Sequence, residues 1–237
     1  GLGVGTPGTV DRQGTVIAAP NLAWHGLPLQ HRLAGALALP VHVENDANVA
    51  VLAERAFAEG PANLIRVQVS RGVGAGLLIA GSVVTGTSSA AAEIGHVSLP
   101  WPSVEEAPGP ACWCGLSGCL ETWISGTGFQ RDHKETTSRD WKAQAVVEAA
   151  RLGDADAAGA LDRYIDRLGR ALAMVVNLVD PEVFVLGGGM SNVAELYDRL
   201  PEVVARHVFS DHWEGRIVPA KWGDSSGVRG AARLWDA

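Results

Sequence analysis

The 237-residue sequence predicts an α/β fold, and three observations lead to this prediction. Hydrophobic residues make up 47% of the chain and charged residues only 19%, which is enough apolar material for a buried core in one large domain or two small lobes. The 29 glycines fall in short loops that directly follow β-rich runs. Runs with strand character are followed by helical spacing in both halves of the chain.

The charge of the chain and its N-terminal residues exclude several classes of partner. The net charge is −7, from 19 Lys and Arg against 26 Asp and Glu, and no cluster of basic residues offsets the resulting repulsion of phosphate backbones. The first residues carry no basic region ahead of an apolar run, and no stretch approaches the length that crosses a bilayer. We therefore expect a cytoplasmic protein with no nucleic acid and no membrane as partner.

In the first half, a strand followed by a helix places polar residues at a strand end. Residues 41–44 are expected as a short strand, and residues 47–58 show helical spacing. Asn45 and Asp46 then lie at the carboxyl end of the strand, where α/β folds bind their ligands. Asx residues here are also common turn formers and helix caps, so Asp46 taken alone is more often a cap than a catalyst.

A glycine-rich turn follows the next predicted strand. Residues 64–70 and 77–79 are expected as two strands joined by the turn 71–76, which includes Gly72 and Gly74. Its backbone N–H groups can bind phosphate oxygens. Tight turns require glycine for their own geometry as well, so the loop alone favours neither interpretation.

The second half is more helical. An apolar stripe at three- and four-residue spacing predicts one long helix, which Asp180-Pro181 ends. The stripe consists of Leu161, Ile165, Leu168, Leu172, Val175 and Val179. A buried strand at 182–186, the turn Gly187-Gly188-Gly189 and a helix capped by Asn192 are expected to follow. A strand, a triple glycine and a helix N-terminus in this order favour a nucleotide site.

The most polar stretch of the chain, residues 132–140, lies between these two halves. We therefore expect a lobe boundary near residues 125–145. Residues 1–125 would form the first lobe and residues 126–237 the second.

Residues 112–119 form the strongest local motif. Cys112 and Cys114 are one residue apart and Cys119 follows across two glycines, so the three thiolates can fold around one ion. The fourth ligand is expected to be His96, because Zn²⁺ accepts a closed Cys₃His tetrahedron. Three buried free cysteines and a loop histidine are the alternative interpretation. A structural zinc also suits a reducing compartment, where three neighbouring cysteines remain unpaired.

Three carboxylates lie beside loops and strand ends that suit ligand binding. They belong to Asp46, Glu93 and Glu121. Ligands with many hydroxyl groups need carboxylates that accept paired hydrogen bonds, and one carboxylate can take a proton from an attacking hydroxyl. Three tryptophans can stack on a sugar ring, although packing is the more frequent role of such residues. These are Trp24, Trp101 and Trp123.

Four motifs together resemble the ROK family, the repressor, open-reading-frame and kinase group, in order and spacing. They are Glu44-Asn45-Asp46-Ala47-Asn48, Glu93-Ile94-Gly95-His96, Cys112-x-Cys114-Gly115-x-x-Gly118-Cys119-x-Glu121 and Leu186-Gly187-Gly188-Gly189-Met190-Ser191-Asn192. The match spans nearly the whole chain, and the cysteine motif followed by Glu121 is specific to this family. Residues 124–129 and 223–232 look most like the bacterial fructokinase and mannokinase branch.

The resemblance implies an actin-like ATPase (ribonuclease H-like) fold of two α/β lobes that transfers phosphate from Mg-ATP to the 6-hydroxyl of a free hexose. Asp46 resembles the family's general base. The positions that resemble sugar ligands are Asn45, Glu93, His96 and Glu121, with Asn21 and Gly8 bordering the sugar. Those that resemble nucleotide contacts are Gly72, Gly74, Gly187, Gly188, Gly189 and Met190. Fructose is favoured by the branch, while glucose, mannose and N-acetylhexosamines stay open; a homodimer is expected because the family commonly dimerises.

Two departures from the family pattern bear on this expectation. The family opens with an Asp-x-Gly-Gly-Thr phosphate loop that this sequence lacks, so we expect an incomplete N-terminal lobe that holds the γ-phosphate and Mg²⁺ poorly. Ser70-Arg71 stands where family kinases usually carry Gly-Thr, and Arg71 either contacts phosphate or blocks its approach. Two alternatives therefore stay open, a sugar-responsive transcriptional regulator of the same family and a catalytically inactive sugar-binding fragment.

Overall fold

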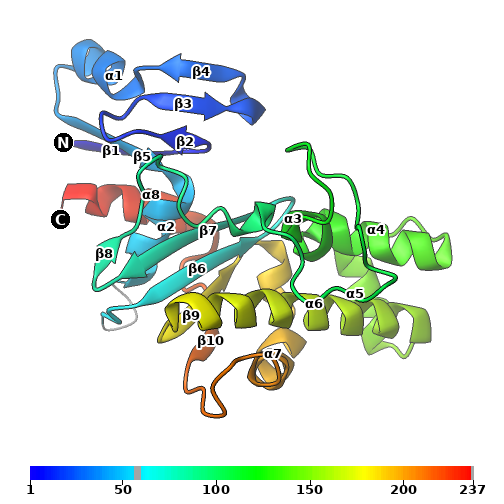
Figure 1. The fold of residues 1–237 in the computed structure, drawn as a ribbon. Helices are drawn as coiled ribbons and strands as arrows, with labels where there is room; N and C mark the ends of the chain where they lie inside the picture. The colour runs from blue at the N-terminus through cyan, green and yellow to red at the C-terminus, as the bar shows by residue number, and fades with distance from the viewer. Residues whose placement is uncertain (56–59, 236–237) are drawn as a thin grey trace. The chain divides into compact units, whose positions relative to one another are not determined.

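The computed structural model describes residues 1–55 and 60–235 and divides the chain into two compact units (Figure 1). Unit 1 comprises Gly1–Arg66, Ala75–Glu93 and Ala220–Ala237, and unit 2 comprises Val67–Gly74 and Ile94–Pro219. Both units are discontinuous in sequence, because the chain leaves unit 1 and later returns to it. This division differs from the expected one into residues 1–125 and 126–237.

Two small sheets begin unit 1. β1 (Leu2–Thr6) and β5 (Val41–Asn45) pair in parallel, while β2 (Thr9–Val10), β3 (Val16–Ala19) and β4 (Trp24–Leu27) form an antiparallel sheet in that order. Side chains alternate between the two faces of a strand, so every second residue can enter the core. The buried cluster consists of Val10, Val16, Ala19, Val41 and Val43. The predicted strand at 41–44 is therefore confirmed.

Three helices complete unit 1. They are α1 (Leu29–Leu37), α2 (Asp46–Arg55) and α8 (Ser226–Ala232), with short 3-10 turns η1 (Pro20–Leu22), η4 (Gly223–Ser225) and η5 (Arg233–Trp235). The helix expected at 47–58 is confirmed as far as Arg55, and its residues 56–58 lie outside the described part of the chain.

Two glycines let α8 pack backbone to backbone within unit 1. A Cβ added to Gly230 would lie 1.5 Å from the carbonyl oxygen of Val49 in α2, and one added to Gly3 in β1 would lie 1.8 Å from that of Ala231. Any side chain at these positions would force the elements apart. Segments from the two ends of the chain thus share one tightly packed contact.

A five-stranded sheet has the strand order β10-β9-β6-β7-β8. The strands are β10 (Arg216–Pro219), β9 (Val183–Gly187), β6 (Leu64–Val69), β7 (Val73–Ile79) and β8 (Ser82–Val83). β10 and β9 pair in parallel, and β7 and β8 pair antiparallel. The predicted strands at 64–70 and 182–186 are confirmed. The glycine-rich turn is shorter than expected, because Gly74 and Gly76 lie inside β7 rather than in the turn.

The helices of unit 2 lie mostly after residue 119. They are α3 (Leu120–Ile124), α4 (Gly126–Thr137), α5 (Ala143–Arg151), α6 (Ala155–Val179) and α7 (Glu195–Ala205), with short 3-10 turns η2 (Ile94–His96) and η3 (Gly189–Asn192). α6 is the predicted long helix. Asp154 caps its N-terminus by accepting a hydrogen bond from the N–H of Ala157 at 3.0 Å, and Asp180 ends it in a left-handed conformation.

The expected cap at Asn192 is wrong. The Asn192 side chain donates to the carbonyl oxygen of Gly189 at 3.3 Å, within the turn η3. α7 begins only at Glu195, after Ala194, and has no side-chain cap. The 3-10 turn that follows the triple glycine therefore takes up the residues that the sequence pattern assigned to the start of the helix.

Much of the polar stretch 132–140, near which a lobe boundary was expected, is helical. Its first residues belong to α4, where Asp132 accepts a hydrogen bond from Arg167 of α6 at 2.7 Å. Arg167 Nε and Arg170 Nη2 each lie 2.8 Å from Glu106 Oε1. The side chains of all four residues are at most 12% exposed. Asp132 of this stretch thus takes part in a buried ion network that ties α4 and the loop containing Glu106 to α6.

We expect Glu106→Gln to lower the free energy of unfolding by about 3 kcal/mol, because it leaves two buried guanidinium groups short of a charged partner. Urea denaturation at pH 7 measures this change. Glu135→Gln is the matched control, since Glu135 is 65% exposed in its pair with Arg131. This substitution should change the free energy of unfolding by less than about 0.5 kcal/mol. Equal effects of the two substitutions would show that the buried network does not stabilise the fold.

The same network predicts an acid sensitivity. Burial by itself raises the pKa of Glu106, but hydrogen bonds from Arg170 and Arg167 outweigh it and lower the pKa from 4.5 to about 2. A lowered pKa in the folded state stabilises the protein above pH 4.5, and this stability is lost as the pH falls from about 4.5 toward 2. Glu106→Gln should remove this part of the pH dependence.

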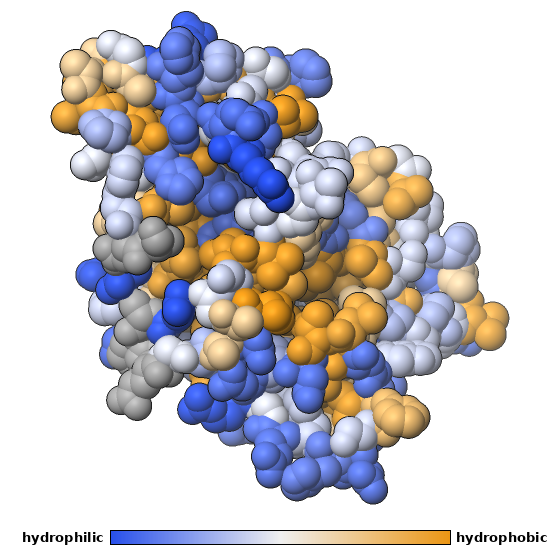
Figure 2. All heavy atoms as spheres, turned by 60° about the vertical axis from the view of Figure 1, so that its left-hand side comes forward, coloured by the Kyte–Doolittle hydropathy of each residue, from blue (hydrophilic) through white to orange (hydrophobic). Residues whose placement is uncertain are grey.

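Among the described residues, no helix combines the length and the apolar character that crossing a membrane requires. Figure 2 shows apolar side chains grouped in several places on a face that also carries many polar ones.

Candidate functional site

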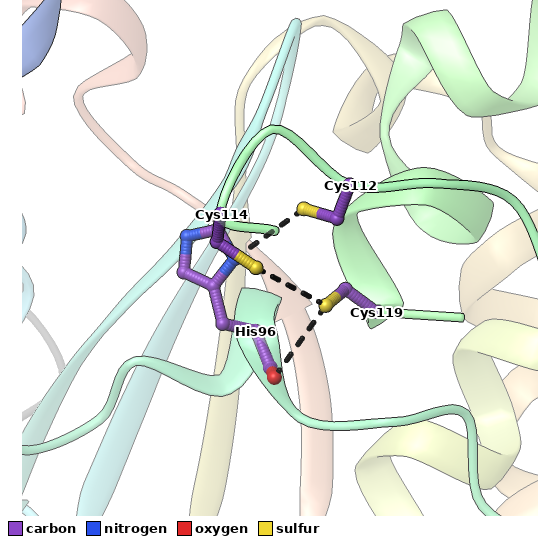
Figure 3. A group of neighbouring side chains, drawn as sticks. All are labelled: His96, Cys112, Cys114 and Cys119. Atoms are coloured by element: carbon purple, nitrogen blue, oxygen red, sulfur yellow. Dashed lines mark hydrogen bonds between the residues drawn. The ribbon is translucent and has the colours of Figure 1, made fainter. Parts of the chain in front are cut away.

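Four metal-ligating side chains converge in unit 2 (Figure 3). They belong to His96, Cys112, Cys114 and Cys119, whose ligand atoms all lie within 4.8 Å of one another. Cys112 Sγ and His96 Nδ1 are 3.6 Å apart, and so are the Sγ atoms of Cys114 and Cys119. A tetrahedral zinc with Zn–S bonds of about 2.3 Å separates its ligand atoms by about 3.8 Å. The four side chains therefore fit a zinc ion, as the sequence spacing predicts.

The backbone of residues 111–119 holds this arrangement. Gly115 and Gly118 have φ values of 93° and 73°, which favour glycine. The N–H of Cys112 donates to Leu116 at 2.7 Å, which closes the loop. In the absence of a cation, burial and the neighbouring thiols raise the pKa of Cys119 to about 12. A bound cation is what would keep this buried sulfur as a thiolate at neutral pH.

Glu121, in the first turn of α3, is held from two sides. Its Oε1 accepts a hydrogen bond from the indole N–H of Trp113 at 2.5 Å, and its Oε2 accepts one from the backbone N–H of Val73 at 3.0 Å. A Cβ on Gly72 would lie 2.6 Å from Oε2, so a larger residue there would push the Glu121 carboxylate out of this position. This carboxylate therefore connects the cysteine loop to the glycine-rich turn between β6 and β7.

The two predicted nucleotide turns lie together in unit 2. A Cβ added to Gly188, whose φ is 86°, would lie 2.6 Å from the carbonyl oxygen of Val69 at the end of β6. Gly126, the first residue of α4, donates its N–H to Ser70 at 2.6 Å and lies close to the side chain of Met190. The turn after β6, the turn after β9 and the start of α4 thus meet at one end of the sheet.

One glycine in η3 and one near the start of β7 have open space beside them. A Cβ added to Gly74 or Gly189 would meet no atom within 4 Å, so packing does not require glycine at either position. Gly187 and Met190 are buried, at the end of β9 and in η3. Gly189 is exposed in the turn that directly follows β9, and turns of this kind are a common place for phosphate oxygens to bind.

A cavity of about 260 Å³ adjoins Glu121 in unit 2. Its lining includes Arg71, Trp113, Glu121, Ser125, Thr127 and Arg131. Thr127 donates its hydroxyl to the carbonyl oxygen of Arg71, which fixes the turn on α4. Within the described residues, the guanidinium of Arg71 makes no hydrogen bond or ion pair and stays available to a ligand.

Asn45 and Asp46 lie at the carboxyl end of β5 in unit 1. Asn45 Oδ1 accepts hydrogen bonds from the N–H groups of Ala47 and Asn48 at 2.8 and 3.2 Å, and Asn45 Nδ2 donates to Gly8 at 2.9 Å. Asn45 is therefore the helix cap. By residue type alone, Asp46 would more often be a helix cap. Because Asn45 caps α2, the Asp46 carboxylate does not serve as the cap.

The carboxyl group of Asp46 has a raised pKa. Asp46 is exposed, yet surrounding protein atoms desolvate its carboxylate and raise its pKa above the ordinary 3.8. Hydrogen bonds from the backbone N–H groups of Ala47 and of Asp46 itself, and the charge of Arg66, oppose this rise. A carboxylate with a raised pKa is a stronger base, which suits proton abstraction.

The other sugar-binding candidates in unit 1 are exposed. Asn21 belongs to η1, and Glu93 comes directly before η2. Gly8 supplies the carbonyl oxygen that fixes Asn45.

Of the aromatic residues considered for sugar stacking, Trp123 packs in the core. It is 8% exposed, and the guanidinium groups of Arg131 and Arg167 lie 5.6 and 4.4 Å from its ring. Trp24 and Trp101 are partly exposed. The residue that sequence reasoning missed is Trp113, whose position between two metal-binding cysteines was the available signal.

The comparisons with known proteins agree with this geometry. The sequence profile of the ROK family matches residues 1–237. The chain belongs to the ROK family. An N-acetyl-D-glucosamine kinase of Photobacterium profundum is 36% identical over 240 residues, which cover 98% of this ROK protein and 79% of that relative. The curated relatives do not single out the fructokinase and mannokinase branch.

Two solved structures with a similar fold were found. A ROK family glucokinase from Streptomyces griseus, in complex with glucose and AMPPNP, has a TM-score of 0.82 at 31% identity, covering 98% of this ROK protein and 80% of that chain. A ROK family transcriptional regulator, a homologue of the E. coli MLC protein, has a TM-score of 0.84 at 27% identity, covering 97% of this chain and 60% of that one. The fold of this ROK protein is the actin-like ATPase fold of the family's sugar kinases.

Proposed function

We propose that this protein is an ATP-dependent sugar kinase that phosphorylates a free hexose at the 6-hydroxyl. The observation that carries the proposal is the meeting, in unit 2, of the Cys₃His cluster, the carboxylate of Glu121 and the two glycine turns. The kinase relative covers nearly the whole chain, which supports the same reaction.

N-acetylglucosamine heads the candidate substrates. The curated relative is named for this sugar, and a solved relative holds glucose. Fructose, which sequence resemblance favours, stays in the test panel because these hexoses differ in only a few hydroxyl and acetamido contacts.

Each candidate residue has a role in this proposal. Asp46 takes the proton from the 6-hydroxyl as it attacks, which its raised pKa favours. Glu121, already oriented by two protein N–H groups, accepts hydrogen bonds from sugar hydroxyls through its remaining lone pairs. The further sugar ligands are Asn45, Glu93, His96 and Asn21.

Mg-ATP supplies the transferred phosphoryl group when it is bound. Gly72 and Gly74 would hold its phosphates through backbone N–H groups, and the turn from Gly187 to Met190 would hold its adenosine. Transfer between bound reactants depends on position and charge more than on covalent help, so rigid turns are the main requirement.

Zinc would be structural in this enzyme. His96, Cys112, Cys114 and Cys119 fill all four positions of a tetrahedron and leave none for a water or a substrate. The ion would hold the loop that precedes Glu121, and thereby the sugar-binding carboxylate.

A coupled ADP-release assay tests the proposal on the purified protein, with MgATP and N-acetylglucosamine, glucose, mannose and fructose. We expect turnover with N-acetylglucosamine or glucose, at a kcat/KM at least about tenfold above that for fructose. A preference for fructose would support the substrate that the sequence resemblance favours. No ADP release with any hexose that the protein demonstrably binds would contradict the kinase.

A sugar-responsive transcriptional regulator is the second candidate. The ROK regulator of known structure has a TM-score similar to that of the glucokinase, although at lower identity, and Arg71 stands in the turn where family kinases usually carry Gly-Thr. Calorimetric binding of a hexose without any ADP release would favour this candidate, or a catalytically inactive sugar-binding protein.

A further inference from the structure

Trp113 contacts two of the candidate sugar ligands at once. Its indole N–H donates to Glu121 Oε1, and its ring meets the imidazole of His96 edge to face, with centroids 4.9 Å apart and planes at 86°. The residue also belongs to the loop of residues 111–119 that would hold the metal ion (the metal loop), where it lies between Cys112 and Cys114. One side chain thus touches the carboxylate, the imidazole and the loop that a zinc ion would hold.

The exposure of Trp113 is unusual for its size. It is 68% exposed, so the fold obtains little hydrophobic stabilisation from it. Its ring lines the cavity beside Glu121, together with the unpaired guanidinium of Arg71. A large aromatic residue that is held by a hydrogen bond rather than by burial is positioned for a ligand more than for the core.

The bond from Trp113 also limits how Glu121 can turn. With Oε2 bound to the N–H of Val73 and Oε1 bound to the indole, the carboxylate plane is fixed at both oxygens. Without the indole N–H, the carboxylate would be held at Oε2 alone and could tilt about that bond, and each sugar would have to restore its orientation.

We propose that Trp113 is a positioning residue for sugar recognition, which fixes Glu121 and His96 relative to the metal loop and forms a wall of the sugar pocket. This inference rests on the proposed function. It assigns the pocket beside Glu121 to the sugar and makes sugar affinity, not phosphoryl transfer, the property that Trp113 controls.

Trp113→Phe tests the hydrogen bond, because it keeps an aromatic ring and removes the N–H. We expect the KM for the hexose to rise roughly tenfold, the loss of one hydrogen bond to a charged group. The KM for ATP and kcat at saturating sugar should change by less than about threefold. Trp113→Ala, which also removes the ring, should raise the KM for the sugar further.

Leu116→Ala is the control for the loop. Leu116 lies in the same loop, is 60% exposed and is not among the residues that line the cavity. Its sugar KM should equal that of the native protein, and zinc content should be the same in all variants. A comparable rise in the KM of Leu116→Ala would show a general loosening of the loop and overturn the specific role of Trp113.

A spectroscopic readout is independent of turnover. The chain has eight tryptophans, and the indole ¹H–¹⁵N signal of Trp113 is identified by its absence from Trp113→Phe. Glu121→Gln and bound hexose should each shift this signal. A signal that moves with neither overturns the proposal.

The outcomes separate this inference from the proposed function. Native protein that binds and phosphorylates a hexose while Trp113→Phe has an unchanged sugar KM overturns the inference alone. Native protein that binds no hexose in calorimetry overturns both.

Discussion

Asp46→Asn is expected to lower kcat by about 10³-fold while hexose binding stays within about twofold of the native protein. The substitution removes the group that accepts the proton of the attacking hydroxyl and keeps nearly the same size and shape. Because Asn45, not Asp46, caps α2, the helix should keep its start and the fold its stability. Single-turnover phosphorylation and calorimetric sugar binding measure the two quantities.

Asp162→Asn is the matched control for this variant. Asp162 is 61% exposed in a surface pair with Arg199 and should leave kcat unchanged. The raised pKa of Asp46 adds a prediction for the native enzyme, because kcat should fall on the acid side at a pH above the ordinary aspartate range. Turnover retained in Asp46→Asn would assign the proton to another acceptor.

Cys114→Ser is expected to reduce bound zinc from one ion per chain to almost none. Cys114 is exposed, so serine fits without steric conflict, and the loss reflects ligand chemistry rather than packing. Zinc binding contributes directly to folding in structural sites, so Tm should fall by about 10 °C or more. Metal analysis and thermal unfolding on the same sample measure both effects.

A chelator should produce the same fall in Tm for the native protein and none for Cys114→Ser. Leu116→Ala should keep its zinc, because that side chain is exposed on the same loop and holds no ligand atom. One zinc ion per chain in Cys114→Ser would exclude Cys114 from the site.

Local sequence patterns predicted the elements of the fold well. Strand β5, the long helix α6 and strand β9 depend on spacing within a single segment, and the sequence shows that spacing directly. The division into units depends on which distant segments meet. No periodicity in the sequence shows that Ala220–Ala237 groups with Gly1–Arg66, and the expected boundary near residues 125–145 was drawn from the polarity of that stretch.

In the site, as in the fold, the features that depend on local spacing were predictable and those that depend on distant contacts were not. The cysteine cluster follows from ligands close in sequence, and His96 was expected as the fourth ligand because zinc accepts a Cys₃His tetrahedron. The bond from Trp113 to Glu121 depends on how the loop folds back on α3, which the spacing does not specify. Asn45 and Asp46 are equally suited to cap a helix by residue type, and only the hydrogen bonds of Asn45 assign that role.

The packing of α8 against α2 and β1 has a consequence for protein synthesis. The ribosome makes β1 and α2 before α8, so the glycine contacts that join them to α8 can form only after residues 226–232 have emerged. Unit 2, most of it the continuous segment 94–219, can fold earlier. During translation the apolar surface of β1 and α2 that α8 covers therefore stays exposed until α8 has been made, and in this interval a nascent chain would most need a chaperone.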